Sequence, residues 1–121
     1  MAVRQHTTVN LVGGTIRVTW TGLLNTDTGS LVAAPDHLFK DVQVFGTFGA
    51  AGNLRIEGSL DGGTTFAALN DAQGNALNMA AAAIERVQET CATVRPNVTA
   101  GDGTTSLTVV MILKTPNAAD A

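Results

Sequence analysis

The chain has 121 residues, of which 45% are hydrophobic and 14% are charged, and its formal net charge is -3. This length suits a single domain, and the charged share lies well below the roughly 25% of an ordinary soluble domain. The seven Lys and Arg residues are scattered from Arg4 to Lys114 without a run. Nucleic-acid binding needs clustered cations, so we expect no direct contact with DNA or RNA.

The small number of charges predicts that the chain associates with other protein subunits. A free monomer of this composition would expose neutral and apolar patches, which usually mark contact sites. No apolar stretch approaches the ~20 residues of a membrane span, and no apolar segment follows Arg4 as it would in a signal peptide. The single cysteine, Cys91, can form no internal disulfide. We therefore expect a homo-oligomer or assembly component that matures in a reducing compartment, without a membrane anchor.

The first third of the chain contains one regular segment between two irregular ones. Residues 1–14 show no strand period and are expected to form an N-terminal arm, whereas residues 15–21 alternate apolar and polar side chains like a half-buried strand. Residues 22–35 are rich in Asn, Asp, Thr, Gly and Ser and predict a long loop. The apolar residues of the irregular segments either cap the protein's own core or contact other subunits. Candidate contact residues are Val9, Leu11, Leu23, Leu24, Leu31 and Val32.

The middle of the chain carries the clearest strand patterns. Residues 40–48 and 54–60 both alternate apolar with polar positions, and a Gly-rich turn at residues 49–53 joins them. Two such strands predict an antiparallel hairpin. Residues 64–69 follow the Asp61-Gly62-Gly63 turn and extend the pattern to a β-meander.

The last third contains one ambiguous segment. Residues 79–89 carry strong helix formers within a β rhythm, and we expect a strand edge with at most a short helical turn. Residues 93–99 include Pro96, which lacks a backbone donor and therefore predicts an edge strand or a bulge. Residues 106–114 are apolar on both sides, which indicates a central strand or one covered by a partner. We expect residues 115–121 to form a flexible tail.

These short strands and Gly-rich turns predict an all-β fold. We expect an antiparallel β-sandwich or jelly-roll over residues 15–114, with a long N-terminal arm and loop.

Residue patterns for catalysis or cofactor binding are missing from the sequence. His6 and His37 lack a metal-binding spacing, and none of Ser30, Ser59 and Ser106 lies in a Gly-x-Ser-x-Gly elbow. The acidic residues lie mainly in turns, and the glycines form no phosphate-binding loop. We expect no enzymatic activity, no catalytic residue, no cofactor and no bound metal.

The hairpin region carries a family resemblance. Residues 56–66 contain Ser59-x-Asp61-Gly62 followed by Phe66, and this stretch resembles a strand-turn-strand signature of discoidin-like and other jelly-roll domains. Together with the later turn segments, the second half of the chain is similar to small structural proteins of tailed phages, including capsid decoration (cement) proteins. This resemblance implies synthesis in the host cytoplasm and a place on the capsid surface of the virion. It also implies contact with the major capsid protein or other virion proteins, often as a trimer.

Two alternatives to a decoration protein remain open. One is a carbohydrate- or receptor-binding module of a tail fibre or spike, which exposed aromatics around Phe45, Phe48 and Phe66 would favour. However, discoidin-like domains often have Trp where this chain has Phe66, and the chain has one Trp, four Phe and no Tyr. The other alternative is a head-tail or tail component. We predict a non-enzymatic decoration protein that stabilises the capsid lattice.

Overall fold

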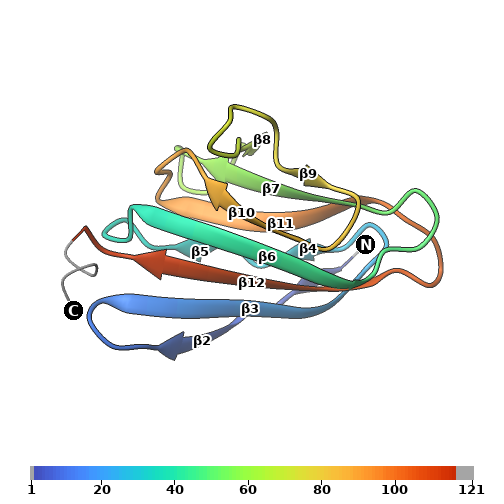
Figure 1. The fold of residues 1–121 in the computed structure, drawn as a ribbon, viewed down its shortest axis with the longest axis horizontal. Coiled ribbons are helices and arrows are strands. Elements are labelled where there is room, and N and C mark those ends of the chain that lie inside the picture. The colour runs from blue at the N-terminus through green and yellow to red at the C-terminus, as the bar shows by residue number, and fades with distance from the viewer. Residues whose placement is uncertain (1, 117–121) are drawn as a thin grey trace.

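The computed structural model describes residues 2–116, and over this range the chain contains strands but no helix. The strands form two mostly antiparallel sheets that pack face to face and run along the long axis of the molecule (Figure 1). The predicted all-β sandwich is therefore confirmed. Most of the predicted tail, residues 117–121, lies outside the described residues. Because the described range holds no helix, it also offers no helical candidate for a membrane span.

Sheet A has seven strands, and its main order is β1-β4-β11-β7-β8, with β5 paired to β11 and β9 paired to β7. Its strands are β1 (Val3–Arg4), β4 (Thr28–Gly29), β5 (Val32–Ala33), β7 (Asn53–Ser59), β8 (Ala67–Ala68), β9 (Asn78–Met79) and β11 (Thr93–Ala100). Sheet B has five strands in the order β10-β6-β12-β3-β2. They are β2 (Thr7–Asn10), β3 (Thr15–Leu24), β6 (Phe39–Thr47), β10 (Ala83–Val87) and β12 (Ser106–Lys114).

The core lies between the two sheets because each long strand turns alternate side chains inward. As predicted, β12 is a central strand, paired with β6 on one side and β3 on the other. Its inward side chains include Val109 and Met111, which are fully buried. One cation shares this interior: Lys40 is 1% exposed, and its Nζ donates to the carbonyl of His37 at 2.9 Å. Burial lowers the pKa of Lys40.

The predicted hairpin between residues 40–48 and 54–60 is wrong. Its first half is β6, which pairs with β10 and β12 in sheet B, whereas its second half is β7, which pairs with β11 in sheet A. The Gly-rich turn crosses from one sheet to the other. Side-chain alternation indicates which face of a strand is buried, but two strands can bury their faces in one core from opposite sides. The first pairing of the predicted β-meander is therefore wrong, whereas its second is confirmed, because β7 pairs antiparallel with β8.

The predicted edge position of residues 93–99 is also wrong, because β11 lies inside sheet A between β7 and the short strands β4 and β5. The N–H of Val98 donates to Asp27 on the β4 side, so the nitrogen of Pro96, two residues earlier, faces the same side. On that side, β4 pairs with β11 at Asn97, and β5 pairs with β11 at Thr93 and Val94. Pro96 lies between these two pairings. Proline is tolerated because neither β4 nor β5 pairs with it on this side, while β7 pairs with Pro96 on the other. The predicted irregularity is present as a register shift between Val98 and Ala100.

The two segments expected to be irregular pair with the edges of the sheets. In the N-terminal segment, β1 runs parallel to β4 and β2 runs antiparallel to β3. In the segment 22–35, β3 continues to Leu24, and β4 and β5 follow. The ambiguous segment 79–89 contains strand β10 rather than a helix, because the pairing of β10 with β6 outweighs local helix propensity.

Candidate interaction surfaces

The outer face of sheet B combines apolar and hydroxyl side chains. Strand pairing places Ile84 of β10, Val110 of β12 and Thr19 of β3 in one row across the sheet, with Gln43 between the first two. Phe45 of β6 lies opposite Thr108 of β12 in the next row. The Ile84 side chain is 68% exposed, although it is large and apolar.

The charges of this face gather near one end. Pairing aligns Arg17 of β3 with Ile112 of β12, Asp41 of β6 and Arg86 of β10, and Lys114 lies opposite Phe39 in the adjoining row. The remaining outward positions are neutral. We call this part of sheet B the uncharged face; its members are Thr19, Leu24, Gln43, Phe45, Thr47, Ile84, Ser106, Thr108 and Val110.

The structure separates the six predicted contact residues. Leu23 is 0% exposed and Val32 is 7% exposed, so their inclusion is corrected: both lie in the core. Inward positions of β3 and β5 bury them, whereas the sequence around them had suggested a loop. The other four, which remain candidates for contact, are exposed: Val9, Leu11, Leu24 and Leu31.

These four do not form one patch. The backbone N–H of Leu11 donates a hydrogen bond to the carbonyl of Thr15 at the start of β3, and Leu24 is the last residue of that ten-residue strand. The side chain of Leu31 belongs to another region, near Gly63 of the β7–β8 connection. Of the four, Leu24 belongs to the uncharged face.

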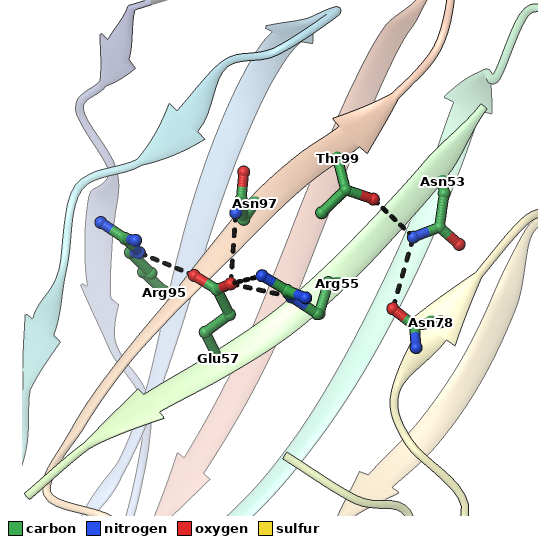
Figure 2. Close-up of polar contacts among 7 residues, drawn as sticks. All are labelled: Asn53, Arg55, Glu57, Asn78, Arg95, Asn97 and Thr99. Carbon is green, nitrogen blue, oxygen red and sulfur yellow. Dashed lines mark hydrogen bonds and ion pairs between the residues drawn. The ribbon is translucent and has the colours of Figure 1, made fainter. Parts of the chain in front are cut away.

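A second surface, the polar cluster, lies on the outer face of sheet A. Figure 2 shows its centre, where three side chains of β7 and β11 point toward Glu57. The Nε of Arg95 donates to Oε1 of Glu57 at 3.0 Å, and the Nε of Arg55 donates to Oε2 at 2.8 Å. The amide of Asn97 also donates to Oε2, at 3.2 Å. Beside this centre, Nδ2 of Asn53 donates to Thr99 and Asn78. We define the polar cluster as Asn53, Arg55, Glu57, Asn78, Arg95, Asn97 and Thr99.

The carboxylate at the centre of the polar cluster is buried although its strand position faces outward. Glu57 is 2% exposed, because the side chains that donate to it also cover it. Burial would raise the pKa of Glu57, but hydrogen bonds from Asn97, Arg55 and Arg95 outweigh burial and hold the pKa below its usual value. The carboxylate is therefore ionised at neutral pH and fixes both arginines.

The aromatic residues expected for glycan recognition are spread over the molecule. Phe45 is exposed on sheet B, whereas Phe48 packs against the core. Phe66 lies beside the polar cluster, and the guanidinium carbon of Arg95 lies 3.8 Å from the centre of its ring. Arg95 therefore covers one face of Phe66.

A groove of about 470 Å³ opens beside Leu60 and residues 88–91, which include Cys91. The carboxylate of Glu89 is engaged there, because it accepts hydrogen bonds from the backbone and the side-chain amide of Asn70 at 2.8 and 2.7 Å. Burial would raise the pKa of Glu89, but these hydrogen bonds lower it. Among the described residues, no three His, Cys, Asp or Glu side chains lie together as a metal-binding group.

Sequence reasoning missed the polar cluster, although part of its signal is visible. Asn53, Arg55 and Glu57 occupy alternate positions of one strand, and Arg95, Asn97 and Thr99 do so in another. This alternation indicates two polar faces. Only the pairing of β7 with β11 shows that they form one surface.

Comparison with known proteins identifies similar folds but no family. No protein-family model matches the chain, and no curated protein sequence matches it. Among solved structures, the SPBc2 prophage-derived protein YomS is similar with a TM-score of 0.61 and 11% identity, over 87% of this chain and 98% of YomS. At this identity, the likeness shows a shared fold.

Two similar structures are enzymes. Oxalate oxidase has a TM-score of 0.42 and 17% identity over 86% of this chain and 42% of its own. Hydroxypropylphosphonic acid epoxidase from S. wedmorenis, in complex with fosfomycin, has a TM-score of 0.44 and 13% identity over 89% and 49%. This chain thus spans about half the length of either enzyme.

These two enzymes correct the expectation that the chain is not an enzyme. That expectation was wrong because it rested on missing sequence motifs, whereas structures similar to most of this chain include enzymes. Both TM-scores lie below 0.5, so the likeness assigns this chain no reaction and no catalytic residue.

Proposed function

We propose that the chain is a structural protein of a phage particle, and specifically a capsid decoration protein that binds neighbouring virion subunits through the uncharged face of sheet B. The observation that carries the proposal is this face itself. It presents Phe45, Ile84 and Leu24 to solvent among neutral side chains. A protein partner would remove these apolar groups from water, which favours association.

Two further observations support this proposal. The fold is shared with YomS, a prophage-derived protein, along nearly its whole length. The second half of the sequence also resembles small virion proteins, with Ser59, Asp61 and Phe66 in the shared turn signature. In this chain Asp61 accepts hydrogen bonds from Ser59, Thr64 and Thr65, so the signature here forms a closed turn.

The proposal is tested by assembling the particle encoded with this chain in the presence of Phe45→Asp. Burying a new carboxylate in an apolar contact is costly, so we expect most copies of the chain to be lost from purified particles. The number of copies is measured by quantitative gel analysis and by cryo-electron microscopy.

Phe39→Asp is the matched control, because Phe39 lies on the same strand and is 43% exposed, against 42% for Phe45. It lies at the charged end of the sheet beside Arg86, outside the uncharged face. We expect this variant to stay on the particle. Equal retention of Phe45→Asp and the unmodified chain, with both folded, would contradict the proposed contact, and absence of the unmodified chain from particles would contradict the virion assignment.

A further inference from the structure

The two arginines of the polar cluster are held in place but only partly used. Arg95 donates its Nε to Glu57 and lies against Phe66, and within residues 2–116 its two Nη groups make no hydrogen bond. Arg55 donates Nε and one Nη to Glu57 and keeps its other Nη. The side chain of Arg95 is 28% exposed and that of Arg55 is 37% exposed. The cluster therefore presents fixed N–H donors to solvent.

Fixed donors favour binding because little conformational entropy remains to be lost. Arginine side chains normally move among many rotamers. Here the buried carboxylate of Glu57 orients both guanidinium groups, and the guanidinium of Arg95 also packs against the ring of Phe66. Figure 2 shows the two arginines on opposite sides of Glu57. The arrangement is suited to a planar oxyanion, which guanidinium groups bind through paired hydrogen bonds.

The local charge also favours an anion. Two arginines and one glutamate leave one net positive charge at the centre of the polar cluster, on a chain whose formal net charge is -3. The other basic side chains lie elsewhere: Arg4 pairs with Asp27, Lys40 is buried, and Arg17, Arg86 and Lys114 lie on sheet B. The polar cluster therefore lacks the row of cations that binding to a nucleic-acid backbone requires. Binding of a single carboxylate requires no such row.

We propose that Arg55 and Arg95 bind a carboxylate side chain of an acidic protein segment on the outer face of sheet A. The neighbouring amides of Asn53, Asn78 and Asn97 provide further polar groups for the backbone of such a segment. This inference is independent of the proposed function, because it concerns the face of the sandwich opposite the uncharged face.

The first experiment follows the Nε–Hε NMR signals of Arg55 and Arg95 in the full ¹⁵N-labelled chain. The probe is the peptide acetyl-Gly-Asp-Gly-Glu-Gly-amide, compared with its Asn/Gln counterpart. We expect saturable shifts of both signals with the acidic peptide only, and weaker binding at high salt. Equal responses to the two peptides, or no response to either, would overturn the proposal. Tighter binding of inorganic phosphate or of an oligothymidylate would overturn the assignment to a protein carboxylate.

A pair of variants locates the site. Arg95→Gln should weaken binding of the acidic peptide about tenfold, because a charge-assisted hydrogen bond is lost. Arg86→Gln is the matched control, because Arg86 also lies over a phenylalanine ring, that of Phe39 on sheet B, but contacts no part of the polar cluster. We expect this control to bind normally, and equal weakening by both changes would overturn the proposal. If Arg95→Gln does not fold, the comparison of the two peptides on the unmodified chain decides the question.

Discussion

A single buried carboxylate holds the N-terminal segment against the sandwich. Asp27 is 4% exposed and accepts the backbone N–H groups of Ala2 and Leu24 at 3.0 and 2.9 Å, and the Nε of Arg4 at 2.8 Å. Burial would raise the pKa of Asp27, but the hydrogen bonds from Arg4, Leu24 and Ala2 outweigh burial and lower it. The N-terminal segment and the end of β3 thus both bond to one ionised side chain.

The sign of this pKa shift predicts how stability depends on pH. Because the folded-state pKa of Asp27 lies below the unfolded value of about 4, its stabilisation is complete above that value and is lost as the pH falls through the folded pKa. We expect Asp27→Asn to lower the free energy of unfolding by about 1–2 kcal/mol at neutral pH and to flatten its decline below about pH 4. Urea unfolding across this range measures both effects.

The matched control for Asp27 is Asp36→Asn. Asp36 is exposed in a loop and makes no side-chain hydrogen bond within the described residues. Its substitution should leave the pH profile unchanged. If the free energy of unfolding of Asp27→Asn changed with pH in the same way as that of the unmodified chain, Asp27 would have no part in acid unfolding.

At the scale of elements, the sequence predicts strands better than their partners. Alternation located β3, β6 and β7 within a few residues, because a half-buried strand needs an apolar side chain at every second position, and a continuous apolar run located β12. Pairing is a long-range property. Strand β12 pairs with β3, although the two strands lie near opposite ends of the sequence, and no local pattern identifies such a partner.

The same limit applies to the candidate surfaces. Phe45 interrupts the polar side of its strand, so its exposure was visible in the sequence. The uncharged face depends on which strands flank it, and the polar cluster joins Glu57 to Arg95 across 38 positions of the chain. Leu23 and Val32 show the converse: an irregular sequence context concealed two core residues.

The packing of β4 against β11 gives a prediction at this scale. Gly29 of β4 is buried, and a Cβ atom there would lie 2.5 Å from Cγ of Pro96 and 2.6 Å from Cδ1 of Trp20. Both neighbours are rings in a packed interior, so neither can move away easily. We expect Gly29→Ala to lower the free energy of unfolding by about 1–3 kcal/mol, measured by urea unfolding.

Gly103→Ala is the control for this overpacking. A Cβ atom at Gly103 would meet nothing within 4 Å, and its φ is not positive. We expect this substitution to change stability by less than about 1 kcal/mol. A similarly small effect of Gly29→Ala would show that β4 can move away from β11.

At the scale of the whole molecule, sheet B ends in two strands that lack a neighbour on one side. Over the described residues, β2 pairs only with β3 and β10 pairs only with β6. Exposed strand edges are templates for pairing with another chain. When two different edges of one molecule pair head to tail, the contact repeats from copy to copy and can close into a ring.

The pairing of β2 with β10 of the next copy is the contact we propose for a homotrimer, the oligomer that the resemblance to decoration proteins implies. Ile84 is the test position, because it lies on β10 and is 68% exposed. A lysine on an edge strand opposes pairing between sheets, so Ile84→Lys should sediment as a monomer at micromolar concentration while the unmodified chain sediments as a trimer. Leu60→Lys is the control, because Leu60 is 88% exposed in the turn after β7 and belongs to neither edge strand. It should remain trimeric, and a monomeric unmodified chain would refute the edge contact directly.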